Sequence, residues 1–290
     1  MAAAPAAVHP DAGHSAAGRA AAGRADAGRP GAPGRCSQPM LAPVLALLLA
    51  APAPAPACSL PPLAGPAPWH TGERLRMELS LLGSVKVGEV QFSVERPISG
   101  GAVIPLVSKA RNTARFGPLQ KLVAMGLSWV DARSLRPERY REQSDEDGRR
   151  RSMDVRFVPP GPSVTLDLLD GATRGSATFE RQGEALDAVA AMYYLRATRL
   201  VAGDRICLDL VANGKYWRFD GAVARATERI EVPAGRFEAV RVEGTARRAD
   251  GAGKSRAIWL WFSADARRLP LAVVSEVDLG MVSARLEEAG

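Results

Sequence analysis

The stretch Leu186–Arg199, LDAVAAMYYLRATR, decides the fold, because it is the one segment after the N-terminal leader whose spacing predicts a helix. Its apolar residues recur at the i, i+3, i+4, i+7 and i+11 positions of one helical face. The helix dipole favours an anion in the first turn and a cation in the last. We therefore predict a helix over residues 186–198, with these candidate structural residues: Leu186, Asp187, Val189, Tyr193 and Arg196.

Strand-like alternation of apolar and polar residues lies on both sides of this helix. Residues 75–81 alternate strictly, which predicts a half-buried strand. In residues 85–95 the apolar phase slips by one at Gly88-Glu89, which indicates a β-bulge. Asn213-Gly214 is the strongest two-residue hairpin signal. Roughly 14 short strands are predicted, at the even spacing typical of sandwiches and barrels.

These patterns predict an all-β fold with one main helix. We expect residues 69–290 to form a single antiparallel domain, a strongly curved sheet or incomplete barrel, with helix 186–198 packed on its concave face. No alternation of strands with helices occurs, which disfavours a Rossmann or P-loop architecture.

The net charge of +7 does not indicate a nucleic-acid-binding protein. Lysines are few among the 38 basic residues, and Ala, Gly, Pro and Arg are abundant throughout, a bias typical of a GC-rich genome. A mild positive excess spread along the chain indicates a solvated surface. We therefore expect no nucleic-acid partner.

The N-terminus is organised like a leader followed by an export signal. Residues 1–39 lack large apolar side chains, so they are either disordered or, if translation starts later in the sequence, never made. Residues 40–57 contain an apolar core too short to span a bilayer, and small residues end it, which predicts a signal peptide. Residues 58–68 are expected to form a Pro-rich tether.

Two cysteines follow the predicted cleavage site. Cys58 comes directly after it, so either its lipidation or ordinary cleavage is expected, although Ala55 and Pro56 make a poor lipidation motif. Cys207 lies in an apolar run, where we expect a buried free thiol. A Cys58–Cys207 disulfide stays open as the alternative, since an oxidising envelope permits it.

The sequence predicts no catalytic, cofactor-binding or metal-binding residues. His70 is the sole histidine after the leader, and no serine sits in a G-x-S-x-G elbow. Gly253-Lys254-Ser255 ends like a phosphate-binding loop, but Arg248 occupies the position of the required glycine. We therefore expect a hairpin loop there and a protein that is not an enzyme.

Five stretches carry a resemblance to a known family: residues 69–75 (WHTGERL), 85–89 (VKVGE), 187–196 (DAVAAMYYLR), 232–244 (VPAGRFEAVRVEG) and 259–273 (WLWFSADARRLPLAV). They resemble the DUF3108 family, a domain of unknown function found in exported bacterial proteins. The resemblance spans about residues 69–286 and departs from the family at Met77 and Ala190. It implies a predominantly β envelope protein and supplies no activity or catalytic residues.

Three classes of function follow from these expectations. The first is a non-enzymatic exported envelope protein whose curved sheet binds an apolar ligand, such as a lipid or a lipoprotein acyl chain. The second is a structural or interaction protein for envelope integrity with no ligand cavity, and the third is an envelope-polymer hydrolase. We expect a periplasmic or membrane-anchored protein with a lipid or envelope protein as partner. Membrane association is expected only if Cys58 is lipidated, and the oligomeric state is left open.

Overall fold

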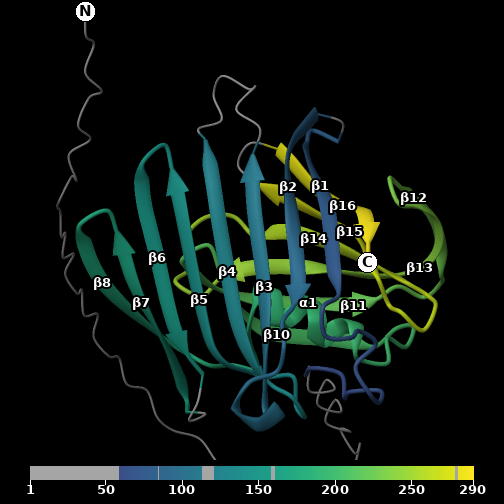
Figure 1. Cartoon of the computed structure of the whole chain (residues 1–290), viewed down its shortest axis with the longest axis horizontal. Coiled ribbons are helices and arrows are strands. Elements are labelled where there is room, and N and C mark those ends of the chain that lie inside the picture. Colours follow the sequence, from purple (N-terminus) through teal and green to yellow (C-terminus); the bar gives the residue numbers. More distant parts are fainter. Residues whose placement is uncertain (1–58, 84, 113–120, 158–160, 278–279) are drawn as a thin grey trace, which may run out of the picture. The chain divides into compact units, whose positions relative to one another are not determined.

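The structure, a computed structural model, describes residues 59–83, 85–112, 121–157, 161–277 and 280–290. The predicted leader, the predicted signal peptide and Cys58 lie outside these ranges. Within them the chain forms sixteen strands, one α-helix and one short 3-10 turn, η1 (Ser99–Gly101). All the strands belong to one sheet, in the order β8-β7-β6-β5-β4-β3-β2-β1-β16-β15-β14-β13-β11-β10-β9, with β12 paired to β13 (Figure 1).

The first eight strands are consecutive along the chain and lie side by side, and we call them the first wall. They are β1 (Arg74–Leu81), β2 (Val85–Val94), β3 (Val103–Asn112), β4 (Leu122–Asp131), β5 (Pro137–Glu146), β6 (Arg149–Arg156), β7 (Ser163–Asp170) and β8 (Thr173–Glu180).

The remaining elements form the second wall and the helix. They are β9 (Ala185–Asp187), α1 (Ala188–Arg196), β10 (Arg205–Ala212), β11 (Lys215–Val223), β12 (Glu228–Val232), β13 (Gly235–Arg248), β14 (Arg256–Ser263), β15 (Pro270–Val277) and β16 (Gly280–Ala289). The two walls are continuous through the β1–β16 pairing. Every pairing is antiparallel except that of β9 with β10.

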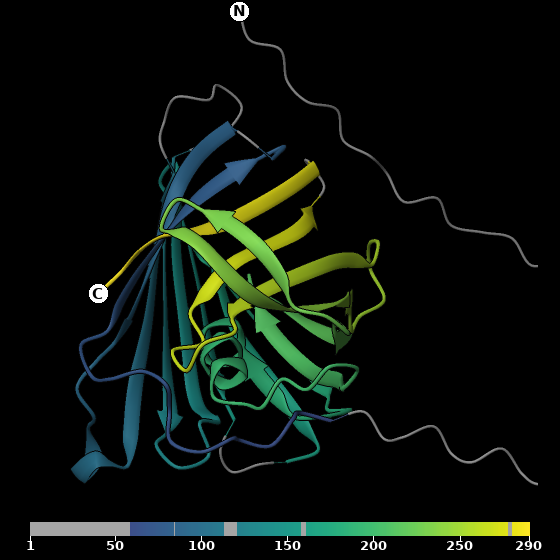
Figure 2. The same cartoon turned by 90° about the vertical axis from the view of Figure 1, so that its right-hand side faces the viewer.

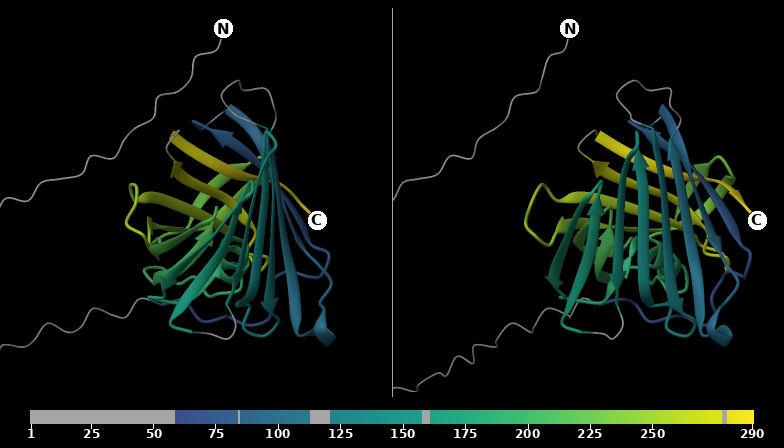
Figure 3. Two further views of the ribbon diagram at one scale, coloured as in Figure 1. Left: turned by 90° about the vertical axis from the view of Figure 1, so that its left-hand side faces the viewer. Right: turned by 60° about the vertical axis from the view of Figure 1, so that its left-hand side comes forward.

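The sheet curls so that the two walls face each other, with α1 between them (Figures 2 and 3). The helix contacts β3 and β4 of the first wall and β9 and β10 of the second. An open, strongly curved antiparallel sheet with one helix on its concave side confirms the predicted fold class.

The helix is shorter than predicted at both ends. Leu186 and Asp187 belong to β9, and the extended backbone of Asp187 (φ −86°, ψ 167°) makes it the N-cap. Ala197 caps the other end. Every residue from Val189 to Arg196 is buried, because walls lie on both sides of the helix. No helix in the described ranges is long and apolar enough to cross a membrane.

The slip in apolar phase in β2 marks a real irregularity in the sheet. Leu79 pairs with Gly88 while the next residue, Ser80, pairs with Lys86, so the register shifts at Val87. A Cβ on Gly88 would lie 2.3 Å from the carbonyl oxygen of Arg111 in β3. Only glycine allows the two backbones to approach so closely at the bulge.

The predicted hairpin at Asn213-Gly214 is also confirmed. Ala212 pairs directly with Lys215, and the two turn residues have φ values of 53° and 67°. Two consecutive residues with positive φ are typical of a type I′ turn, which suits the twist of the flanking strands. This turn fixes the end of the β10–β11 hairpin beside α1.

The segment expected to be a Pro-rich tether packs on the helix. Leu60 is buried in the main core. The Tyr194 hydroxyl donates a hydrogen bond to the Pro61 carbonyl (3.1 Å), and the Ala64 amide donates to the Ala197 carbonyl (2.8 Å). Residues 60–64 therefore pack against the C-terminal end of α1.

Candidate functional site

The N-terminus of α1 is built around the buried carboxylate of Asp187. Its Oδ1 accepts hydrogen bonds from the amides of Val189 (3.0 Å) and Ala190 (2.9 Å), two of the donors that a helix start leaves unpaired. Its Oδ2 accepts the hydroxyl of Ser128 in β4 (2.6 Å). Burial raises the pKa of Asp187 to about 6, against the lowering effect of these three donors. Asp187 therefore joins the helix to the first wall.

The C-terminal turn of α1 carries a fully buried guanidinium, that of Arg196. It forms a two-pronged ion pair with Glu73, with Nη1–Oε1 at 2.6 Å and Nη2–Oε2 at 2.9 Å. Its Nε donates to the Arg268 carbonyl (3.0 Å) and its Nη2 to the Arg267 carbonyl (3.3 Å). The sequence predicted only a favourable interaction with the helix dipole, whereas Arg196 joins three distant segments.

Two aromatic rings complete the surroundings of this cation. The Arg196 guanidinium lies 5.3 Å from the ring centre of Trp69 and 5.2 Å from that of Tyr193, within cation–π range. The two rings meet edge to face, with centres 5.1 Å apart. The family-like stretches at residues 69–75, 187–196 and 259–273 therefore meet at one place, and their role there is to hold the fold together.

A pocket of about 740 Å³ opens on the concave side near the other end of the helix. It lies between strands β2–β7 of the first wall, the first residues of α1 and the β10–β11 turn. We call it the concave pocket. Its apolar lining includes Val90, Phe92, Leu122, Ala124, Met153 and Leu168.

The lining also contains polar side chains, among them the carboxyl of Glu142 in β5. Its Oε2 accepts hydrogen bonds from the Tyr140 hydroxyl (3.0 Å) and the Asn213 amide (3.1 Å). Burial raises the pKa of Glu142 above its ordinary value. No described residue donates to Oε1. Glu142 is thus fixed through one oxygen, and its other oxygen stays available to a donor within the pocket.

The floor beside Glu142 requires a residue without a side chain. A Cβ on Gly126 would lie 2.7 Å from the Ser108 Oγ and 2.9 Å from the Tyr140 hydroxyl oxygen. At the rim, Arg151 pairs with Glu146 (3.0 Å) and Asp170 (3.3 Å). These charges are partly exposed, so the pocket combines apolar side chains, the half-buried acid Glu142 and a charged mouth.

The sequence reasoning did not single out Glu142. A signal was present, because residues at 140, 142, 144 and 146 of β5 share the concave face, and three of the four are Glu or Ser. Polar residues on the inner face of a strand mark either an exposed edge or a polar lining. Only the positions of β4 and β6 on either side show which of the two applies.

The remaining sequence candidates do not gather into a reactive site. His70 is exposed, and its Nδ1 lies 3.0 Å from the Thr71 carbonyl oxygen. The expectation of a free thiol at Cys207 is wrong, because this residue is disulfide-bonded. Its partner and the predicted lipidation site Cys58 lie outside the described residues. In the described ranges no three His, Cys, Asp or Glu side chains come together as a metal site.

The fold and pocket define a class of protein: one open, β-barrel-like sheet curled around a single buried helix. The family model described as "Protein of unknown function (DUF3108)" matches residues 76–287, and the chain belongs to this family. The predicted family membership is therefore confirmed. Curated proteins offer no match to the sequence.

Solved structures resemble the chain at low sequence identity. The β-barrel-like protein of domain of unknown function DUF1849 from Brucella abortus has a TM-score of 0.51 at 9% identity, over 76% of this chain and 97% of that one. This similarity shows a shared fold and nothing further. Neither the family description nor this neighbour's name states a catalytic activity.

Two further structures are less similar. A presumed exported protein with a YmcC-like fold from Bacteroides fragilis has a TM-score of 0.31 at 9% identity, over 80% of this chain and all of that one. A presumed lipoprotein from Parabacteroides distasonis has a TM-score of 0.31 at 8% identity, over 81% of this chain and all of that one. TM-scores this low do not establish a common fold, so neither supports an inference here.

The Glu73–Arg196 pair predicts a large loss of stability when one partner is removed. Arg196→Ala leaves Glu73 buried without its counter-charge, which should lower the free energy of unfolding by about 3–5 kcal/mol. Arg199→Ala is the matched control, because this arginine lies three residues later and is exposed. Urea melts should show little change for the control. Equal, small effects of both substitutions would contradict the structural role of Arg196.

The raised pKa of Asp187 predicts a pH-dependent stability difference from Asp187→Asn, which keeps a capping oxygen. A raised carboxyl pKa stabilises the fold at low pH, and this contribution is lost as the pH rises through about 6. Between pH 4 and pH 7 the free energy of unfolding of the wild type should therefore fall by up to about 3 kcal/mol relative to that of the variant. Ser128→Ala removes a donor to the same carboxylate and should move the loss to higher pH. Urea melts of variant and wild type that stay parallel over this range would contradict the assignment.

Proposed function

We propose that this chain is a non-enzymatic exported protein of a bacterial envelope that binds an acyl chain in the concave pocket. The observation that carries the proposal is the pocket itself, a cavity of about 740 Å³ on the concave side whose lining combines apolar side chains with the carboxyl of Glu142. Its volume falls within the roughly 300–1,000 Å³ typical of small-ligand sites. A filled interior would instead favour a purely structural protein.

The signal-peptide pattern at residues 40–57 supports export. The disulfide at Cys207 agrees with it, since disulfides persist in oxidising compartments. Lipidation of Cys58 stays a prediction, and it competes with this disulfide. An exported chain cut before Cys58 retains only two cysteines, so a disulfide at Cys207 would use the sulfur that a lipid needs.

Glu142 is the residue that would bind the polar end of the ligand. Because Tyr140 and Asn213 already donate to Oε2, the free Oε1 suits a ligand group that donates a hydrogen bond. A hydroxyl or amide on an acyl chain meets this requirement. A free fatty-acid carboxylate suits it less, since either two anions would face each other or one of the two acids would have to bind a proton.

Two neighbouring residues of β4 give a matched test of the site. Ala124 lines the pocket, whereas Val123 points to the opposite face and is 49% exposed. Ala124→Phe should fill the pocket and weaken dodecanol binding by about tenfold or more, a change of about 1.4 kcal/mol. Val123→Phe should leave binding unchanged. Displacement of the fluorophore N-phenylnaphthylamine measures both affinities, and no binding by the wild type would favour a structural protein.

Glu142→Gln tests the role of the acid, because the amide oxygen still accepts from Tyr140 and Asn213. The wild type at pH 8 should prefer dodecanol to dodecanoate, and the variant should bind dodecanoate more tightly than the wild type does. Glu180→Gln, on the exposed edge strand β8, is the control. An unchanged preference in Glu142→Gln would remove Glu142 from the site while leaving the pocket assignment intact.

A further inference from the structure

The outer face of the first wall carries a feature that the concave pocket does not explain. In β4, residues 124, 126 and 128 point to the concave side, where they line the pocket or contact Asp187. The alternate residues therefore point outward. All four are apolar, although the outward face of an antiparallel sheet is ordinarily polar. We call them the β4 stripe: Val123, Met125, Leu127 and Trp129.

The strand register extends this stripe onto β3 and surrounds it with basic residues. Val107 lies opposite Leu127, and Lys109 lies opposite Met125. Further along the same rows are Ser93 and Gln91 of β2, and then Arg74 and Arg76 of β1. The apolar stripe therefore passes directly into a basic surface.

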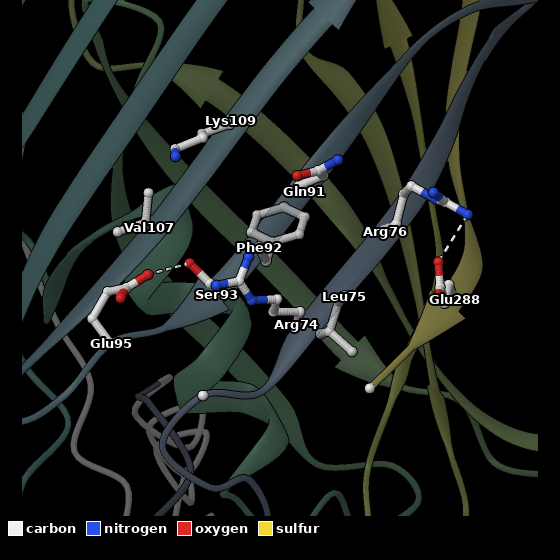
Figure 4. A pocket seen from close by; sticks show the side chains of 12 residues that line it. Arg74, Leu75, Arg76, Gln91, Phe92, Ser93, Glu95, Val107, Lys109 and Glu288 are labelled. Atoms are coloured by element: carbon white, nitrogen blue, oxygen red, sulfur yellow. Dashed lines mark hydrogen bonds and ion pairs between the residues drawn. The ribbon is translucent and has the colours of Figure 1, made fainter.

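A shallow groove of about 410 Å³ marks this basic surface, as Figure 4 shows. Arg76 is paired with Glu288 (2.8 Å), and Glu95 accepts the Ser93 hydroxyl (2.7 Å). In contrast, the side chains of Arg74 and Lys109 form no ion pair within the described part of the chain. The groove thus presents two cations that form no ion pair, beside the carboxylates of Glu95 and Glu288.

The other side of the stripe is also basic. Arg139 lies over the Trp129 ring (5.6 Å) and shares Asp154 with Arg141, so two cations meet one carboxylate. Arg156 lies opposite Arg139 in the β5–β6 register and is exposed. Among the described residues Arg156 has no ion-pair partner. A partly exposed apolar strip is thus bordered on both sides by cations that form no ion pair among the described residues.

We propose that the outer face of β1–β6 docks on an anionic phospholipid bilayer, with the β4 stripe against the headgroup region and Arg74, Lys109 and Arg156 on the lipid phosphates. Long basic side chains bordering an apolar strip match the amphipathic boundary of a membrane. Anionic leaflets attract such residues individually. The face would hold the protein at a membrane without a lipid on Cys58, and it stands independently of ligand binding in the concave pocket.

Vesicle flotation tests this proposal in a Cys58→Ser/Cys207→Ser parent, which cannot be acylated at Cys58 and has no unpaired thiol there. The parent should float with vesicles containing phosphatidylglycerol, bind vesicles of phosphatidylcholine alone much less, and lose part of its binding at high salt, where only the electrostatic contribution is screened. Arg74→Glu/Lys109→Glu should reduce the partition onto the anionic vesicles by about tenfold or more.

The control changes the same net charge elsewhere. Arg225→Glu/Lys254→Glu replaces two exposed basic residues in loops of the second wall and should float like the parent. Met125→Asp, within the β4 stripe, should reduce the binding that survives at high salt. Thermal melts establish that every variant is folded. No flotation of the folded parent, or equal losses in the two charge-reversed variants, would overturn the proposal.

Discussion

The structure depends on the burial of one cation, the guanidinium of Arg196. An isolated buried charge is strongly unfavourable, so the chain must supply both a counter-charge and hydrogen-bond acceptors. Glu73 precedes β1, and the Arg267 and Arg268 carbonyls belong to the loop between β14 and β15. Because these groups are far apart in sequence, satisfying Arg196 brings the two ends of the domain together on the last turn of the helix. The pair specifies one arrangement of the two walls.

The N-terminal end of the helix is held by a hydrogen bond instead of an ion pair, and it borders the concave pocket. Asp187 fixes the helix start to Ser128 in β4, and the helix then fills only part of the space between the walls. The remaining space is the concave pocket beside Glu142. A short rigid helix thus stabilises the curved sheet at one end and forms a boundary of the pocket at the other. The two faces of β4 also differ in use, since its inner residues line the pocket and its outer residues form the stripe.

Much of the fold could be predicted from the sequence, because periodicity and turn chemistry are local properties. The helix, the bulge next to Gly88 and the Asn213-Gly214 turn each follow from residues close together in the chain. The partner of Arg196 could not be found in this way, since Glu73 lies 123 residues away. Strand β9 was missed because three residues are too few to show alternation. Glu142 was missed because its importance depends on strands on both sides of β5.

The central claim is that α1 is an integral part of the core, held at both ends by buried polar groups. Native-state hydrogen exchange of the helix amides tests it most directly, since an isolated helix of nine residues is unstable in water. The account predicts that the amides of Met192–Arg196 exchange only through global unfolding, as slowly as those of β4. Exchange of these amides through local opening, while β4 stays protected, would contradict it.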